Sequence, residues 1–238
     1  MVKEGHIELL GLLESIDTKS VNAEGACRID RLRGEVLALL GRFDEAEEAF
    51  NQARPPAEAT GLKDVIADIL SNLADIALKR GDSESSLGMH RKALELFIEL
   101  KDAVGAARSY NNMGYILRRS GDNTKALDAY SEVESILSDD KSKSLIPAQI
   151  VLARALLDLG HQDRARDHAL SAYEQSENSD DTILHARARA VLGRYYAKTG
   201  DSDLALHHYT DALETMGEAG DPLALVEVSI LLGEVLQD

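Results

Sequence analysis

Apolar residues recur along most of the chain three or four positions apart, which is the spacing of one face of an α-helix. Polar and charged residues fill the positions between them. The runs that show this spacing are, in chain order, Leu70, Leu73 and Ala77; Tyr110, Met113 and Leu117; Leu152 and Leu156; and Leu192 and Tyr196. The pattern predicts an almost entirely helical protein.

A glycine followed by a polar residue interrupts these runs at intervals of 40, 40, 39 and 40 residues, at Gly41, Gly81, Gly121, Gly160 and Gly200. Such a glycine can take the left-handed conformation that ends a helix. Two further series of small residues keep the same register. They lie seven residues before the glycines, at Gly34, Ala74, Gly114, Ala153 and Gly193, and five residues after them, at Ala46, Ser86, Ala126, Ala165 and Ala205. The repeated unit is therefore predicted to be a helix hairpin, with a first helix A and a second helix B.

The register divides the chain into one helix, five hairpins and a last helix. Their expected ranges are 3–17 for the first helix, 25–60, 63–100, 103–138, 145–178 and 182–218 for the hairpins, and 222–237 for the last helix. Breaks are expected at Arg54–Pro55–Pro56, at 138–144 and at 176–181. These are short loops, so we expect one continuous solenoid over residues 1–238.

The composition agrees with a helical fold and also indicates the cellular compartment of the protein. The chain has 238 residues with only 4% aromatic side chains and no tryptophan, which disfavours a β-sandwich or barrel. No stretch approaches the roughly 20 apolar residues needed to span a bilayer, and the N-terminal segment does not resemble a signal peptide. A single cysteine, Cys27, is expected to be a small buried side chain and fits a reducing compartment. We expect a cytoplasmic protein.

The charge balance disfavours two classes of partner. With 26 basic and 42 acidic side chains the formal net charge is −16, so neither nucleic acid nor an anionic membrane is expected as a partner.

The sequence contains no pattern that indicates catalysis. It has no GxxxxGK[ST], GxSxG or HExxH motif. His207 and His208 lie near Asp203 and Asp211, but adjacent histidines on a polar helix are much commoner than a metal site. We expect no enzymatic activity, no cofactor and no metal.

The hairpin pattern resembles the tetratricopeptide repeat family. The resemblance rests on Tyr110, Met113, Gly114, Leu117, Gly121, Ala126 and Tyr130 in one unit, and on Leu192, Gly193, Tyr196, Gly200, Ala205, Tyr209 and Ala212 in another. The period exceeds the usual 34 residues, as in the long-repeat subclass of kinesin light chains, LGN-type polarity adaptors and bacterial peptide sensors. The resemblance implies an all-α fold, a right-handed α-solenoid of tetratricopeptide-type hairpins whose A helices line a concave groove.

Transferring the family's groove positions to this chain gives a basic groove in an acidic protein. Ten of the 25 positions are basic: Arg28, Arg31, Lys79, Arg108, Arg118, Arg119, Arg154, Arg187, Arg194 and Lys198. Four are acidic: Glu35, Asp68, Asp75 and Asp158. We expect the groove to bind an extended, acidic segment, because an arginine fork holds a carboxylate well. The alternative is that these arginines pair with acidic residues of neighbouring helices.

Asn72 and Asn112 occupy one register position in consecutive A helices, with Asn111 beside them. In the long-repeat relatives an asparagine there holds the backbone of a bound peptide, since an amide both donates and accepts. The alternative is an ordinary solvated side chain. Tyr115 is expected either to contact a ligand side chain or to fill space between repeats. The expected peptide contacts are Arg31, Asn72, Arg108, Asn111, Asn112, Tyr115, Arg119, Arg154, Arg187, Arg194 and Lys198.

Both terminal helices are apolar on most sides, a property of buried helices. This suggests a homo-oligomer formed through them, or packing of the last helix on the fifth hairpin. The sequence as a whole predicts a non-enzymatic scaffold that recognises a protein or peptide, with an acidic segment in its groove. The alternative is a sensor or oligomerisation module of a larger signalling or transcription regulator.

Overall fold

The computed structural model describes residues 2–139, 143–177, 181–219, 228–229, 231–233 and 235–236. Within these ranges every regular element is helical. The chain forms two compact units, Met1–Ser120 and Gly121–Asp238, each with its own hydrophobic core. We therefore describe each unit by itself.

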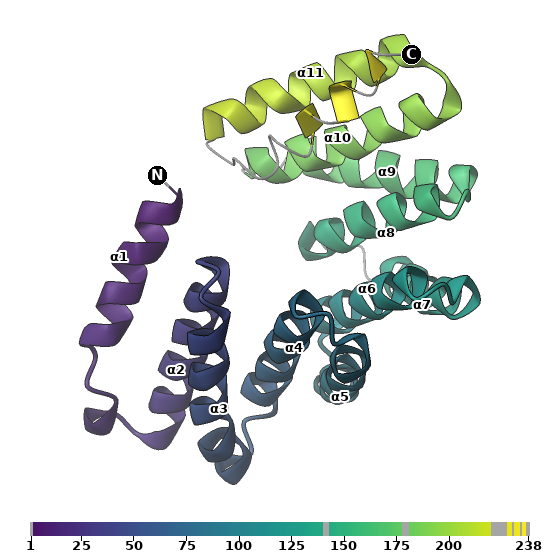
Figure 1. Ribbon diagram of the computed structural model, residues 1–238. Coiled ribbons are helices and arrows are strands. Elements are labelled where there is room, and N and C mark those ends of the chain that lie inside the picture. The colour runs from purple at the N-terminus through teal and green to yellow at the C-terminus, as the bar shows by residue number, and fades with distance from the viewer. Residues whose placement is uncertain are drawn as a thin grey trace. The chain divides into compact units, whose positions relative to one another are not determined.

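Unit 1 is a series of helices in which each packs on the next (Figure 1). Its elements are α1 (Val2–Ser15), η1 (Thr18–Ser20), α2 (Ala23–Leu39), α3 (Phe43–Thr60), α4 (Lys63–Lys79), α5 (Ser83–Leu100) and α6 (Ala103–Arg119). The hairpins are α2 with α3 and α4 with α5, while α3 packs on α4 and α5 on α6. The A helices α2 and α4 also contact each other directly, so their side chains can interact across hairpins.

Unit 2 has the same construction. Its elements are α7 (Asn123–Asp139), η2 (Lys143–Leu145), α8 (Ile146–Asp158), α9 (Gln162–Glu177), α10 (Thr182–Thr199) and α11 (Ser202–Ala219). The hairpins are α8 with α9 and α10 with α11, and α8 contacts α10. The last helix expected at 222–237 lies largely outside the described residues, although 228–229 and 231–233 are helical.

The glycine and small-residue series do what the sequence predicts. Gly41, Gly81, Gly121, Gly160 and Gly200 all have a positive φ, between 79° and 88°. Gly34 lies against the fully buried ring of Phe50, where an added Cβ would come within 2.6 Å of Cε1. Gly193 is in the equivalent position against Tyr209, at 2.8 Å from Cδ1. Small residues in helix A therefore make room for an aromatic ring of helix B.

The break expected at Arg54–Pro55–Pro56 is wrong. Helix α3 continues through both prolines to Thr60 and ends at Gly61, which has a φ of 72°. Ala53 and Ala57, on either side of the pair, are fully buried. The two prolines remove backbone hydrogen bonds from the helix. Packing of the buried alanines on either side compensates for that loss.

Cys27 is fully buried in the core of unit 1, as predicted. Burial raises the pKa of its thiol. In the part of the chain that the structure describes, no helix is long and apolar enough to cross a membrane.

Candidate functional site on the A helices

Charged side chains of unit 1 pair across neighbouring A helices. Arg28 Nη1 on α2 lies 2.8 Å from Asp64 Oδ2 on α4. Asp68, one turn further along α4, lies between two arginines: Arg31 of α2 at 3.4 Å and Arg108 of α6 at 3.1 Å. Burial opposes ionisation of Asp64, yet its pKa is lowered because Arg28 donates to it.

Asparagines continue this pattern along the same helices. Asn72 Nδ2 donates to its own helix at the Asp68 carbonyl, 2.9 Å away, and lies 3.5 Å from Glu35 Oε1 of α2. Asn112 Nδ2 of α6 donates to Asp75 Oδ1 of α4 at 3.2 Å. We call the contacts among Arg28, Arg31, Glu35, Asp64, Asp68, Asn72, Asp75, Arg108 and Asn112 the cross-helix polar ladder.

The ladder gives two of the unit 1 arginines, Arg31 and Arg108, partners within the protein. Arg31 is also paired with Glu35 on its own helix and is only 17% exposed. Arg31 and Arg108 therefore pair with acidic residues of neighbouring A helices, which is the alternative that the sequence left open. The partners are 36 to 40 residues apart, close to the repeat period. Opposite charges at that separation were readable in the sequence and would have indicated this pairing.

One register position assigned to the groove is interior. It carries Ser71, Asn111, Ile150 and Ala190, whose exposed fractions are 3, 3, 7 and 8%. Only Arg31, at the equivalent position of α2, reaches the surface. Asn111 is therefore a buried polar residue rather than one that a ligand can contact.

An open pocket of about 500 Å³ lies on this face of unit 1. Its lining combines apolar and charged side chains from three A helices and the start of α3: Glu35, Ala38, Leu39, Phe43, Asn72, Asp75, Ile76, Lys79 and Arg108. Leu39 is 68% exposed beside the buried Ile76. The pocket thus has an apolar wall next to polar groups, a composition common among ligand-binding pockets.

Tyr115 lies between the two arginines at the end of α6. The Cζ atoms of Arg118 and Arg119 lie 5.8 and 5.7 Å from its ring centroid. Arg119 also donates to the Tyr115 hydroxyl at 3.4 Å. Lys79 and Arg119 are exposed and form no ion pair with any described residue, so the C-terminal ends of α4 and α6 carry uncompensated positive charge.

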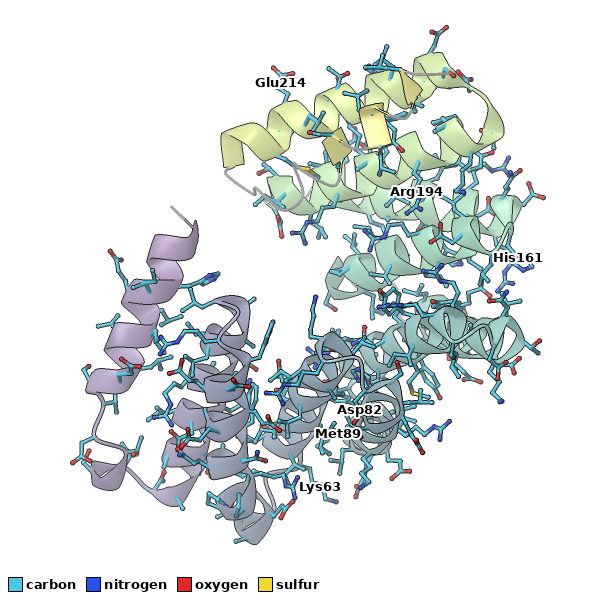
Figure 2. All side chains as sticks on the ribbon, viewed as in Figure 1. Lys63, Asp82, Met89, His161, Arg194 and Glu214 are labelled. Carbon is cyan, nitrogen blue, oxygen red and sulfur yellow. The ribbon has the colours of Figure 1, made fainter. Side chains whose placement is uncertain are left out.

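Unit 2 holds the remaining predicted contacts. Arg194, labelled in Figure 2, lies on α10. It donates to Asp158 of α8 at 2.8 Å. Arg187 and Lys198 are exposed on α10, and Arg154 is half-buried on α8. The predicted set is therefore divided between the units, with Arg31, Asn72, Arg108, Asn111, Asn112, Tyr115 and Arg119 in unit 1 and Arg154, Arg187, Arg194 and Lys198 in unit 2.

The two histidines of the pair on α11 make different contacts. His207 Nδ1 lies 3.7 Å from Asp211 Oδ1, whereas the ring of His208 stacks on Tyr196. Among the described residues, no group of three or more histidine, cysteine or acidic side chains is placed to hold a metal ion.

Two family models match the chain, and both are described as tetratricopeptide repeat. One matches residues 65–139, and the other matches 28–52, 146–170 and 186–209. Together they cover more than half of the chain. The chain belongs to the tetratricopeptide repeat family. The predicted fold class, an all-α solenoid of tetratricopeptide-type hairpins, is confirmed.

Curated and solved relatives of this tetratricopeptide repeat protein are distant in sequence. It is 22% identical over 176 residues to the human outer dynein arm-docking complex subunit 4, covering 73% of this chain and 26% of that protein. The chain thus spans about a quarter of the length of the curated relatives it matches.

Two solved structures illustrate the likeness in fold. A thermophilic TPR protein of Thermus thermophilus has a TM-score of 0.64 at 21% identity, covering 89% of this chain and all of that one. A Rap protein complexed with competence and sporulation factor has a TM-score of 0.69 at 15% identity, covering 99% of this chain and 71% of that one.

Proposed function

We propose that this tetratricopeptide repeat protein is a non-enzymatic scaffold that binds an extended segment of a protein partner on the A helices of unit 1. The observation that carries the proposal is the open pocket beside Asn72 and Asn112. The polar ladder holds both amides in place before a ligand arrives. Side chains fixed in advance lose little conformational entropy on binding.

The segment that we propose is acidic. Lys79 and Arg119 are its expected contacts, because neither is paired with a carboxylate among the described residues. Both lie in the last turn of an A helix, where a cation also stabilises the helix dipole. A bound carboxylate at this end would gain from these cations, whereas Arg31 and Arg108 already have partners.

The names of two relatives agree with a role in protein interaction. The human relative is a subunit of a docking complex, and the Rap structure contains a bound factor. Both names describe the relatives, and the partner of this chain has to be identified by experiment.

The proposal is tested with two double charge-reversal variants, one on the A-helix face and one on a B helix. The variant Lys79→Glu/Arg119→Glu changes the A-helix face, and Arg91→Glu/Lys92→Glu makes the same change in net charge on exposed positions of the B helix α5. Each protein is applied to an array of short acidic, neutral and basic peptides. We expect the wild type to bind the acidic set. The first variant should weaken that binding about tenfold, and the second should leave it nearly unchanged.

Equal loss in the two variants would mean that net charge alone governs binding and would overturn the assignment to the A-helix face. Binding of the neutral or basic set in preference to the acidic set would overturn the acidic specificity.

A further inference from the structure

Asp75 is the carboxylate of the pocket that has no arginine partner in the part of the chain that the structure describes, and its polar contacts are made by one of its two oxygens. Its Oδ1 accepts from Asn112 Nδ2 of α6 at 3.2 Å and lies 3.3 Å from His90 Nε2 of α5. Its side chain is 53% exposed, and its other oxygen has no hydrogen-bond partner among the described residues. Asp75 therefore presents one fixed acceptor to the pocket.

Behind Asp75 lies a buried histidine, His90. The side chain is fully buried, and neither ring nitrogen makes a hydrogen bond within the described part of the chain. A buried polar group without a hydrogen-bond partner is unfavourable for folding. Its Nε2 lies 3.3 Å from Asp75 Oδ1, so the ring is the nearest buried group behind this carboxylate.

The other charged groups of the pocket are already committed, with one exception. Glu35 is paired with Arg31, and Arg108 is paired with Asp68. Lys79 is unpaired but lies one helical turn beyond Asp75 on a long flexible stem. Asp75 is thus the pocket carboxylate that has no cation paired with it, and Lys79 is the pocket cation that has no carboxylate paired with it among the described residues.

The apolar wall beside Asp75 suits a long cationic side chain. Ala38, Leu39, Phe43 and Ile76 offer a surface for methylene groups. Lysine and arginine pack their stems on such surfaces and keep the charged head free. A cation that reaches Asp75 would gain a charge-assisted hydrogen bond, while an acidic side chain would be repelled by its carboxylate.

We propose that this pocket is a subsite for a basic side chain, arginine or lysine, within the segment that binds the A-helix face. The inference rests on the proposed function, because it adds one position of defined chemistry to that segment. The segment would then be acidic where it meets Lys79 and Arg119, with a single basic side chain inserted beside Asp75.

The test uses small probes, so that it does not depend on knowing the partner. N-acetyl-arginine methylamide is titrated into the full chain, and amide chemical shifts are followed by NMR. N-acetyl-citrulline methylamide, which is nearly isosteric and uncharged, is the matched control. We expect the arginine probe to shift the amides around Leu39, Asp75 and Ile76 and to bind about tenfold more tightly than the citrulline probe.

Two substitutions should change this preference in opposite directions. Asp75→Asn keeps the shape and removes the charge at an exposed position, so the arginine probe should bind no better than citrulline. Lys79→Met removes the competing cation and should strengthen binding of the arginine probe. Equal binding of the two probes to the wild type, or an undiminished preference in Asp75→Asn, would overturn the subsite.

Failure of this proposal can be told from failure of the proposed function. Lys79→Met should weaken the binding of acidic peptides on the array and strengthen the binding of the arginine probe. If the acidic peptides behave as expected and the arginine probe shows no preference, only the subsite is wrong. If the arginine probe binds as expected and no acidic peptide does, the acidic specificity is wrong.

Discussion

Gly34 lies where helix α2 crosses the Phe50 ring of α3, with no space for a methyl group. Phe50 is fully buried and cannot move aside. We expect Gly34→Ala to destabilise the protein by about 1 to 3 kcal/mol, the usual effect of forcing an extra carbon into a packed core. Chemical denaturation followed by circular dichroism measures this change in the free energy of unfolding.

Gly88, in the middle of α5, is the matched control. An added Cβ there meets nothing within 4 Å. Gly88→Ala should therefore stabilise the helix by up to about 1 kcal/mol, since alanine is the better helix former. If Gly34→Ala stabilised the protein as Gly88→Ala does, helix propensity rather than close packing would determine the response at Gly34.

The contrast between glycines and arginines shows what the sequence can predict at the scale of the residue. A glycine that ends a helix or lies beneath an aromatic ring repeats with the hairpin, and its role followed from the period alone. The availability of the charge on Arg31 or Arg108 depends instead on Asp68, which lies on another helix. The period of the small residues identifies the helix and its face, whereas the pairing of a charge is read only from an opposite charge about one period away.

Helix α3 shows a similar limit at the scale of the element. Local rules end a helix at Pro55 and Pro56, whereas the structure continues it to Thr60. The register of buried alanines does not break at the prolines, since Ala49, Ala53 and Ala57 are all buried. Where a local signal and a packing stripe disagree, the stripe determines the helix.

The helices α9, α10 and α11 enclose two histidines whose packing makes this region sensitive to acid. The ring of His185 lies 4.9 Å from that of Tyr173, and His208 stacks on Tyr196 at 5.3 Å. Burial lowers the pKa of both histidines, and the charge of Arg189 lowers them further. His207 acts in the same direction on His208, while Asp211 and Glu177 oppose these shifts.

The sign of the pH dependence follows from these shifts. Because the pKa values are lower in the folded state, the unfolded chain binds more protons below the ordinary histidine value of 6.5. The free energy of unfolding should therefore fall as the pH drops through about 6.5. Denaturation curves at a series of pH values measure the slope.

His208→Asn should reduce that slope, because it removes one of the two groups that must take up a proton. An unchanged slope in this variant, or a wild-type stability that rises with acid, would contradict the assignment. Glu134, which faces Arg164 and His168, has a lowered pKa as well. Its protonation affects stability in a separate pH range, near or below 4.5.

At the scale of the whole molecule, the net charge of −16 is unevenly distributed. Residues 1–120 contain 16 basic and 20 acidic side chains, and residues 121–238 contain 10 and 22. The candidate pocket lies in the less acidic unit. The overall charge thus describes mainly unit 2 and does not argue against an acidic partner on unit 1.

The contacts of the described helices run between near neighbours in sequence, such as α2 with α3 and α4, or α10 with α9 and α11. In such a chain stability is approximately a sum of local terms. A destabilising substitution in one unit should therefore loosen its own hairpin and leave a remote hairpin unchanged. Gly34→Ala and Gly193→Ala form a matched pair for this test, because each places a methyl group against a buried aromatic ring.

Hydrogen exchange read by mass spectrometry on the intact chain resolves the two hairpins. We expect Gly34→Ala to speed exchange in α2, α3 and α4 and to leave α10 and α11 at the wild-type rate, with the reverse for Gly193→Ala. The physical reason is that opening one hairpin breaks contacts only with the helices beside it. Equal acceleration in both regions by either variant would mean that the chain opens as a single cooperative unit.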